Sequence, residues 1–161
     1  MYECEYSMID IVQLVLSEHK SNITNLILRQ LPEWFGIEEA IVEYARGAGN
    51  TNFYAAYSLD KPVGFISIRT INIYTSEIYV TAVLKEYQHR GIGKKLLETA
   101  QEELINSNVR FLMVKTLGDS HPDEYYMKTR EFYYKMGFYP LEELKEIWGE
   151  ECPCLIMVKS L

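Results

Sequence analysis

The sequence predicts an α/β fold, or α+β by strict naming, in which a mixed, mostly antiparallel sheet of six to seven strands carries helices on both faces. Three observations lead to this fold class. Runs of β-forming residues follow one another with short connections over residues 52–84. A strand, a glycine turn and an amphipathic helix then occur in that order over residues 77–105. Helical patterns also precede and follow these segments, and the chain closes on two more strands.

Length and composition fit one domain over residues 1–161. The chain is 48% hydrophobic, enough for a sizeable core, and no repeat or low-complexity linker divides it. Its net charge of −7 argues against a nucleic-acid binder, which needs a basic face. No stretch approaches the length of a membrane span, and the first residues lack the regions of a signal peptide. We therefore expect a cytoplasmic protein that binds neither nucleic acid nor membrane.

The cysteines predict neither disulfides nor a metal site. Their odd number, at Cys4, Cys152 and Cys154, favours reduced thiols. The pair Cys152-Pro153-Cys154 is too closely spaced for the usual metal-binding or redox pair, and no second pair stands nearby to complete a site. We expect two thiols at the start of a terminal strand, and no metal.

The N-terminal third predicts a short strand and two helices. The strand falls near residues 2–6. Apolar residues then recur at helical spacing over residues 9–31, and Pro32 ends that pattern. After an aromatic turn a second helix covers residues 37–45, and the glycines that begin at Gly47 stop it.

The middle of the chain predicts a meander followed by a crossover. Strands over residues 52–57, 63–73 and 77–84 are joined by short turns, which favours antiparallel pairing. A helix over residues 92–105 has one apolar face, and a strand over residues 110–117 follows it. Such a strand–helix–strand unit makes a right-handed parallel crossover.

The C-terminal part predicts one helix and the closing strands. The helix covers residues 125–136 and is stopped by Gly137. Strands near residues 138–147 and 154–159 end the chain. Their aromatic residues could support a homodimer.

The glycine turn at Gly91 and Gly93 predicts a phosphate site. A strand precedes it and a helix follows, so unpaired backbone N–H groups and a positive helix end meet there. Lys94 and Lys95 stand in the first helical turn, where they oppose the helix dipole unless an anion offsets them. A dinucleotide fingerprint would need its third glycine at Leu96, and a Walker loop needs four residues between its glycines. Neither alternative fits.

The residues of this turn also carry a family resemblance. The run Gln88-His89-Arg90-Gly91-Ile92-Gly93 is similar to the Q/R-x-x-G-x-G/A signature of the GCN5-related N-acetyltransferase (GNAT) superfamily. Residues 82–87 resemble the strand that leads into that signature, and residues 129–138 resemble the family's R-x-F-Y-x-k-x-G-F segment. With the order of elements, the resemblance covers about residues 52–140.

The resemblance implies that the chain binds acetyl-CoA and transfers its acetyl group to an amine. The pantetheine arm would pair with the backbone of Val83, where the fourth and fifth strands splay apart. Many members carry an Asn near the start of the last helix, where this chain has Tyr126. The backbone N–H groups that would hold the CoA pyrophosphate belong to Gln88, His89, Arg90, Gly91, Ile92, Gly93 and Lys94.

Catalytic residues follow partly from the resemblance. Tyr133 matches the family's proton donor for the departing thiolate. Glu77 is the first choice for the base that deprotonates the amine, and Glu38 and Glu39 are weaker candidates. No histidine triad is recognisable.

Acceptor specificity is expected from the turn between the first two helices. Trp34 and Phe35 there could form an apolar or cation–π surface for an amine, or simply a hydrophobic plug. The expected reaction is a direct attack by a primary amine in a ternary complex. Two other functions stay open: a non-catalytic, regulatory CoA-binding module, and a structural domain whose turn binds nothing.

Overall fold

A computed structural model of the chain describes residues 8–161. The predicted strand near residues 2–6 lies outside the described residues. The elements, in chain order, are β1 (Ile9–Leu14), α1 (Ser17–Leu28), α2 (Glu38–Ala48), β2 (Asn52–Ser58), β3 (Lys61–Thr70), β4 (Thr75–Val83), the 3₁₀ turn η1 (Lys85–Tyr87), α3 (Ile92–Asn106), β5 (Phe111–Leu117), α4 (Glu124–Lys135), β6 (Tyr139–Leu144) and β7 (Cys154–Ser160).

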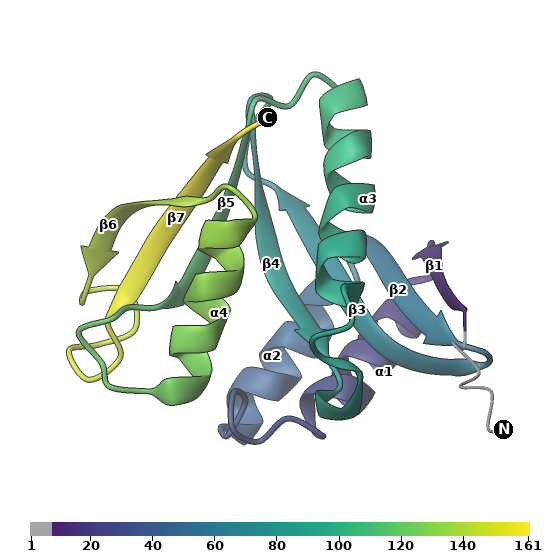
Figure 1. The fold of residues 1–161 in the computed structure, drawn as a ribbon, viewed down its shortest axis with the longest axis horizontal. Helices are drawn as coiled ribbons and strands as arrows, with labels where there is room; N and C mark the ends of the chain where they lie inside the picture. The colour runs from purple at the N-terminus through teal and green to yellow at the C-terminus, as the bar shows by residue number, and fades with distance from the viewer. Residues whose placement is uncertain (1–7) are drawn as a thin grey trace, which may run out of the picture.

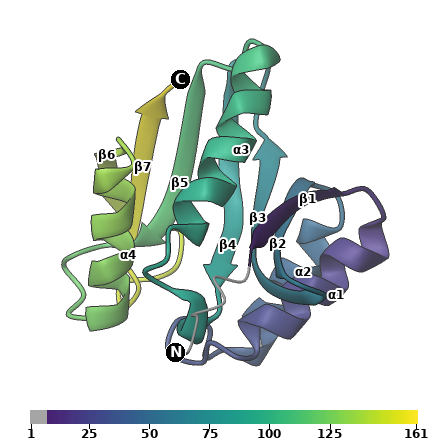
Figure 2. The same ribbon diagram turned by 45° about the vertical axis from the view of Figure 1, so that its right-hand side comes forward.

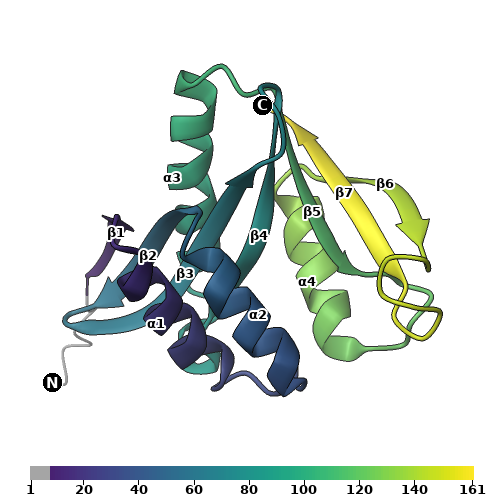
Figure 3. The same ribbon diagram turned by 180° about the vertical axis from the view of Figure 1, so that it is seen from behind.

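The described strands form one sheet in the order β1-β2-β3-β4-β5-β7-β6 (Figure 1). β4 and β5 run parallel, and every other neighbouring pair is antiparallel. Helices α1 and α2 cover one face and α3 and α4 cover the other, as the front and back views show (Figures 1 and 3). The predicted fold class is therefore confirmed.

The first strand corrects the sequence prediction of a helix that begins at Ile9. Residues 9–14 form β1, which pairs antiparallel with β2 from Ile9↔Ser58 to Leu14↔Phe53. Ile9 and Ile11 pack against the core, and the residue after each is exposed. The apolar spacing suited a helix as well as a strand, and the available edge of β2 decides between them. α1 begins only at Ser17.

Helix α3 has the apolar face that its sequence predicted, with one exception. Its buried residues are Ile92, Leu96, Leu97, Ala100 and Leu104. Ile105, also assigned to that face, is 53% exposed. Burying a leucine side chain contributes about 1.5–3 kcal/mol, so this face holds α3 firmly against the sheet. The helix start is thereby fixed beside the end of β4.

β4 and β5 pair over a short length and then diverge. Thr75–Ile78 align with Phe111–Val114 in the parallel register. Beyond these residues the two strands separate toward the end of β4 (Figures 1 and 2). α3 and α4 flank the point of divergence on one face, and α2 contacts β4 on the other. The predicted splay of the fourth and fifth strands is present.

A bulge in β4 turns Tyr79 toward helix α2. The register shifts there because Ser67 pairs with Val80 while Ile68 pairs with Ile78. The Tyr79 ring lies so close to Gly47 that an added Cβ on that glycine would overlap it. Gly47 therefore permits helix packing. The prediction that the segment beginning at Gly47 stops the helix is confirmed, because α2 ends at Ala48 and Gly49 is its C-cap.

Candidate active site

The glycine turn, residues 88–94, begins directly after η1. Two of its residues have positive φ, 62° at His89 and 79° at Gly91. A side chain at position 91 would find open space, so the backbone conformation alone accounts for the glycine. Gly91 is the N-cap of α3 and offers no side-chain cap. The turn is thus shaped by its backbone.

The turn presents a row of backbone donors. No hydrogen bond within the described residues uses the N–H groups of residues 89–94, whereas the next one, of Lys95, donates to Gly91. The first turn of α3 contains no acidic residue. Unpaired N–H donors at the N-terminus of a helix, the positive end of its dipole, make an anion-binding site.

The cationic side chains near the turn are held by other groups. Lys95 Nζ donates to the Ile9 carbonyl at 2.7 Å, and Lys94 Nζ lies 3.8 Å from Glu98. The Arg90 guanidinium lies over the Tyr87 ring at 5.2 Å. The anion site therefore rests on main-chain groups more than on these charges.

Gln88 ties the turn to the end of β4. Its side-chain amide donates to the Val83 carbonyl at 3.0 Å. This bond fixes the turn relative to the last residue of the strand. It also occupies one of the two main-chain groups of Val83 through which a pantetheine arm was expected to pair.

Gly93 brings the turn close to α4. An added Cβ at position 93 would touch the Phe132 ring at 3.4 Å. Tyr133, the next residue, is buried on α4. The Tyr133 ring packs edge-on against Phe132 and Phe138, with centroids 5.4 and 5.3 Å away.

Tyr133 is buried and keeps its proton. Its side chain is 3% exposed, and no hydrogen bond of its hydroxyl is found within residues 8–161. Burial, with smaller effects from the nearby phenols of Tyr126 and Tyr44, raises the pKa of Tyr133 well above the ordinary value for tyrosine. A hydroxyl without a partner remains available to a bound molecule.

Glu77 lies in an ion-pair cluster on the other face. Its Oε2 accepts from Arg69 Nε at 2.6 Å, and its Oε1 lies 3.6 Å from Lys115 Nζ. The three side chains come from β4, β3 and β5, and the Glu77 side chain is 4% exposed. We call Arg69, Glu77 and Lys115 the strand cluster. Of these three residues, sequence analysis predicted only Glu77 as a site residue. Ion pairs between neighbouring strands produce no recognisable pattern in a short stretch of sequence.

Tyr44 of α2 packs beside Tyr79, the ring that the Arg69 guanidinium of the strand cluster covers. Its ring packs edge-on against Tyr79 at 5.4 Å and Phe35 at 6.0 Å. Burial raises the pKa of Tyr44, and the neighbouring Tyr79 and Glu77 raise it further. The same phenol acts on the pKa of Tyr133. The sequence did not single out this tyrosine.

Trp34 connects the α1–α2 turn to α4. Its Nε1 donates to Thr129 Oγ1 at 3.2 Å, and its ring lies edge-on to Tyr125 at 4.8 Å. The Tyr126 hydroxyl donates to the Trp34 carbonyl at 2.8 Å. Tyr126, which stands where many family members carry an Asn, is thus a structural link. Trp34 and Phe35 are both half-buried.

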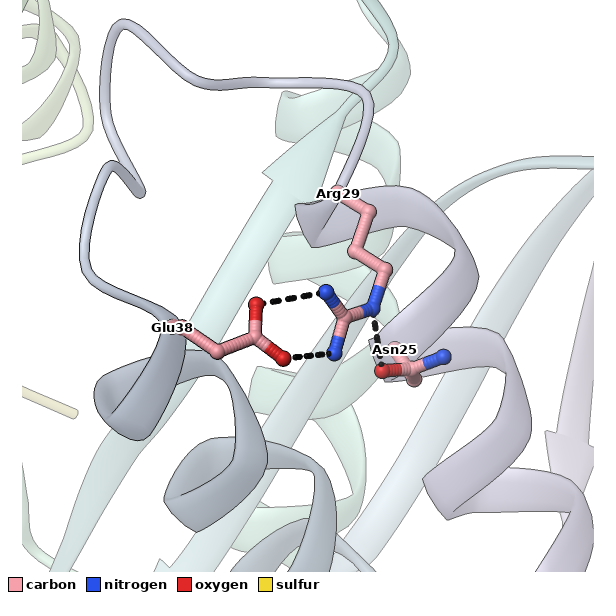
Figure 4. Close-up of polar contacts among 3 residues, drawn as sticks. All are labelled: Asn25, Arg29 and Glu38. Atoms are coloured by element: carbon pink, nitrogen blue, oxygen red, sulfur yellow. Dashed lines mark hydrogen bonds and ion pairs between the residues drawn. The ribbon is translucent and has the colours of Figure 1, made fainter.

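Ion pairs hold this turn in place. Arg29 makes two bonds to the Glu38 carboxylate, at 2.6 and 2.7 Å, and a third to Asn25 at 2.8 Å (Figure 4). Glu33 accepts from Lys85 of η1 at 2.5 Å. Glu38, one of the weaker base candidates, is therefore engaged at the start of α2, and Glu39 is exposed beside it.

The described part of the chain, residues 8–161, offers neither a metal site nor a membrane-spanning helix. No group of three His, Cys, Asp or Glu side chains in this range could hold a metal ion. None of the helices here is both long and apolar enough to cross a membrane. The described cysteines, exposed Cys152 and buried Cys154, are free thiols.

Comparison with known proteins identifies the class of the chain. The acetyltransferase (GNAT) domain family matches residues 49–140. An uncharacterized N-acetyltransferase of Chlorobaculum tepidum is 28% identical over 134 residues, 76% of each chain. A GNAT-family acetyltransferase from Desulfovibrio desulfuricans has the same fold, with a TM-score of 0.78 and 20% identity over 95% of this chain and 99% of that one. The PaiA N-acetyltransferase of Thermoplasma acidophilum, solved in complex with coenzyme A, has a TM-score of 0.73 and 19% identity over 96% and 99% of the two chains.

The fold is the one found in GNAT acetyltransferases. The chain belongs to the GNAT family of acetyltransferases. The resemblance in residues 88–93 and 129–138 is thereby confirmed at the level of the family.

Proposed function

We propose that the protein is an acetyl-CoA-dependent N-acetyltransferase that acetylates a primary amine by direct attack in a ternary complex. The observation that carries this proposal is the row of unpaired N–H groups over residues 89–94 at the start of α3. It lies beside the diverging ends of β4 and β5 in a chain of the GNAT family.

The cofactor site would use the glycine turn from Gln88 to Lys94. The pyrophosphate of CoA would accept from the backbone N–H groups of residues 89–94 at the positive end of α3, because the N–H of Gln88 already donates to the Lys85 carbonyl at 3.3 Å. The pantetheine arm would run along the end of β4 and bind the Val83 backbone. Because the Val83 carbonyl already accepts from Gln88, we expect the arm either to use the N–H or to displace that side chain.

The amine must lose a proton before it attacks. An alkylamine with a pKa of about 10.4 pays roughly 4–5 kcal/mol for this at pH 7. Glu77 would take the proton, through a water molecule, on Oε1, because Oε2 is bonded to Arg69. The amine nitrogen would then bond to the thioester carbonyl carbon, the carbon–sulfur bond would break, and the electron pair would leave with the thiolate of CoA.

Tyr133 would give a proton to that thiolate, and the second proton, which the amine nitrogen loses as the amide forms, would restore the phenol. A phenol of ordinary pKa loses only about 2 kcal/mol in protonating a thiolate. The raised pKa of Tyr133 makes this transfer harder, but a thiolate formed in the same buried surroundings is destabilised as well. Burial therefore supports a neutral donor that acts once charge develops on sulfur. Trp34 and Phe35 would border the entrance for the acceptor.

Two measurements on the full chain test this function. Thermal unfolding with CoA and with acetyl-CoA should show stabilisation of about 2.7 kcal/mol at a hundredfold excess over Kd. Thiol release with a panel of primary amines should then show turnover. Absence of stabilisation would reject CoA binding, whereas stabilisation without turnover would favour the non-catalytic CoA-binding module. The cytoplasmic location and the homodimer stay predictions.

A further inference from the structure

The strand cluster carries one more positive charge than its internal pairing requires. The single carboxylate of Glu77 faces two cations, Arg69 and Lys115, within a chain whose net charge is −7. The Glu77 side chain is 4% exposed, but those of Arg69 and Lys115 are 42% and 27% exposed. The anion is thus a buried support, and the cations above it can be reached from outside.

Most donors of these cations are not used by the protein. Arg69 gives only Nε to Glu77, and within residues 8–161 its two terminal nitrogens donate to no acceptor. Lys115 Nζ lies 3.6 Å from Glu77 and makes no hydrogen bond to a described residue. The Arg69 guanidinium also lies over the Tyr79 ring at 5.1 Å, which limits its rotation. An oriented guanidinium edge with an ammonium beside it matches the geometry of a carboxylate.

The cluster lies next to the proposed reaction centre. Glu77 is two residues before the bulged Tyr79 on β4, whose ring contacts Tyr44. The Arg69 guanidinium lies over that same Tyr79 ring, and its Nε bonds to Glu77. A small molecule held by the two cations would therefore lie beside Glu77, the proposed base, and the Tyr79 and Tyr44 rings.

We propose that Arg69 and Lys115 bind a carboxylate of the acceptor, so that the preferred substrates are amines of the amino-acid type. This inference rests on the proposed function and narrows its substrate class. Glu77 positions the two cations, and the Tyr44 and Tyr79 rings form the wall beside the acceptor. One carboxylate would balance the one excess positive charge of the cluster.

Matched substrate pairs test the proposal. Each pair is an amino acid and the amine that lacks its carboxylate: phenylalanine and phenethylamine, tyrosine and tyramine, lysine and cadaverine. We expect kcat/KM from thiol release to favour the carboxylated member by tenfold or more in at least one pair. Equal or higher kcat/KM for the decarboxylated amines overturns the proposal and leaves the acetyltransferase function standing.

Variants assign that preference to the cluster. Lys115→Gln removes one cation, and Arg69→Lys keeps a charge for Glu77 but loses the guanidinium edge. Both should lower the ratio of kcat/KM within a pair about tenfold. Lys159→Gln is the matched control, because Lys159 lies in the same sheet on β7 and donates to Gln101 of α3, on the opposite face. An equal loss of the ratio in the control contradicts the assignment.

A binding measurement decides the matter even if none of these amines is turned over. Calorimetry with the same pairs, in the presence of CoA, should detect binding of the carboxylated member and its weakening in Lys115→Gln. Absence of carboxylate-selective binding overturns the inference. Absence of turnover, with selective binding intact, counts against the proposed function only.

Discussion

The glycine turn and the strand cluster are built in opposite ways. The turn is one continuous segment, residues 88–94, and offers backbone donors. The strand cluster gathers Arg69, Glu77 and Lys115 from three strands and offers side-chain charges. A backbone site is disturbed by changes of main-chain conformation, whereas a side-chain site is disturbed by the loss of single atoms. The first suits a cosubstrate shared by a whole family, and the second can differ from one acceptor to another.

The largest expected effect comes from Tyr133, which lies between the two regions. Tyr133→Phe removes one oxygen that has no partner among the described residues, so the melting temperature should not fall. The loss of a proton donor should lower kcat by about 100-fold or more. Steady-state thiol release measures this effect, and Tyr134→Phe, at an exposed neighbour, is the control. Unchanged turnover would show that Tyr133 is an ordinary core residue.

The next effect tests whether the turn acts through its backbone. Gly91→Val places a branched side chain at φ 79°, which costs about 1–3 kcal/mol of backbone strain, although the space around it is open. We expect the Kd for CoA to rise tenfold or more in calorimetry. Gly149→Val is a close control, because Gly149 has a φ of 95° and equally open surroundings in the β6–β7 connection. Equal losses in both variants would point to general destabilisation.

A smaller effect, on stability and apart from the loss of turnover expected for the proposed base, comes from Glu77 as the support of the strand cluster. Glu77→Gln removes a charge-assisted hydrogen bond to Arg69 and the attraction to Lys115. Because both cations are partly exposed, we expect a loss of about 1–3 kcal/mol in the free energy of unfolding. Denaturant unfolding measures it, with the exposed strand residue Glu142→Gln as the control. CoA affinity should not change if the two regions are independent.

The smallest effect concerns the ion pair that joins the two sides of the site. The hydrogen bond from Lys85 lowers the pKa of Glu33 below 4.5, and Glu33 raises that of Lys85 above 10.5. The stabilisation of the folded state by this ion pair is complete between pH 4.5 and pH 10.5. It is lost as the pH falls through the lowered pKa of Glu33 or rises through the raised pKa of Lys85.

Glu33→Gln should therefore lower the melting temperature slightly at pH 7, and the difference should shrink as the pH falls below 4.5. Melting curves over a pH series, with Glu150→Gln as an exposed control, measure this. A difference that grows on acidification would contradict the assigned direction of the pKa shift.

What the sequence could predict depends on how far apart in the chain the interacting residues lie. The glycine turn, the α3 face and the Phe132-Tyr133 pair are local, so their patterns are visible in short windows. The helix predicted from Ile9 was wrong because β2, a partner far along the chain, decides that segment. The end of α2 within residues 47–50 was predicted, but the contact of Gly47 with Tyr79 was not, because that contact is not local.

The candidate acceptor site was the least predictable part. Arg69, Lys115 and Tyr44 are ordinary residues in their own segments and acquire meaning only when β3, β4, β5 and α2 come together. Trp34 and Tyr126 were noted for other reasons, and their mutual hydrogen bond was not foreseen. Sequence analysis predicted Glu77 as the base but did not predict its partners Arg69 and Lys115.

The short β4–β5 pairing also bears on how the protein is handled after synthesis. Only Thr75–Ile78 align with Phe111–Val114, so the rest of the two strands gives the sheet an internal rim of main-chain groups. Such a rim can recruit a foreign strand, as exposed sheet edges do in aggregation. A cosubstrate bound along these strands would cover their main-chain groups and so protect the protein from pairing with another chain. Purification and storage with CoA should accordingly reduce self-association.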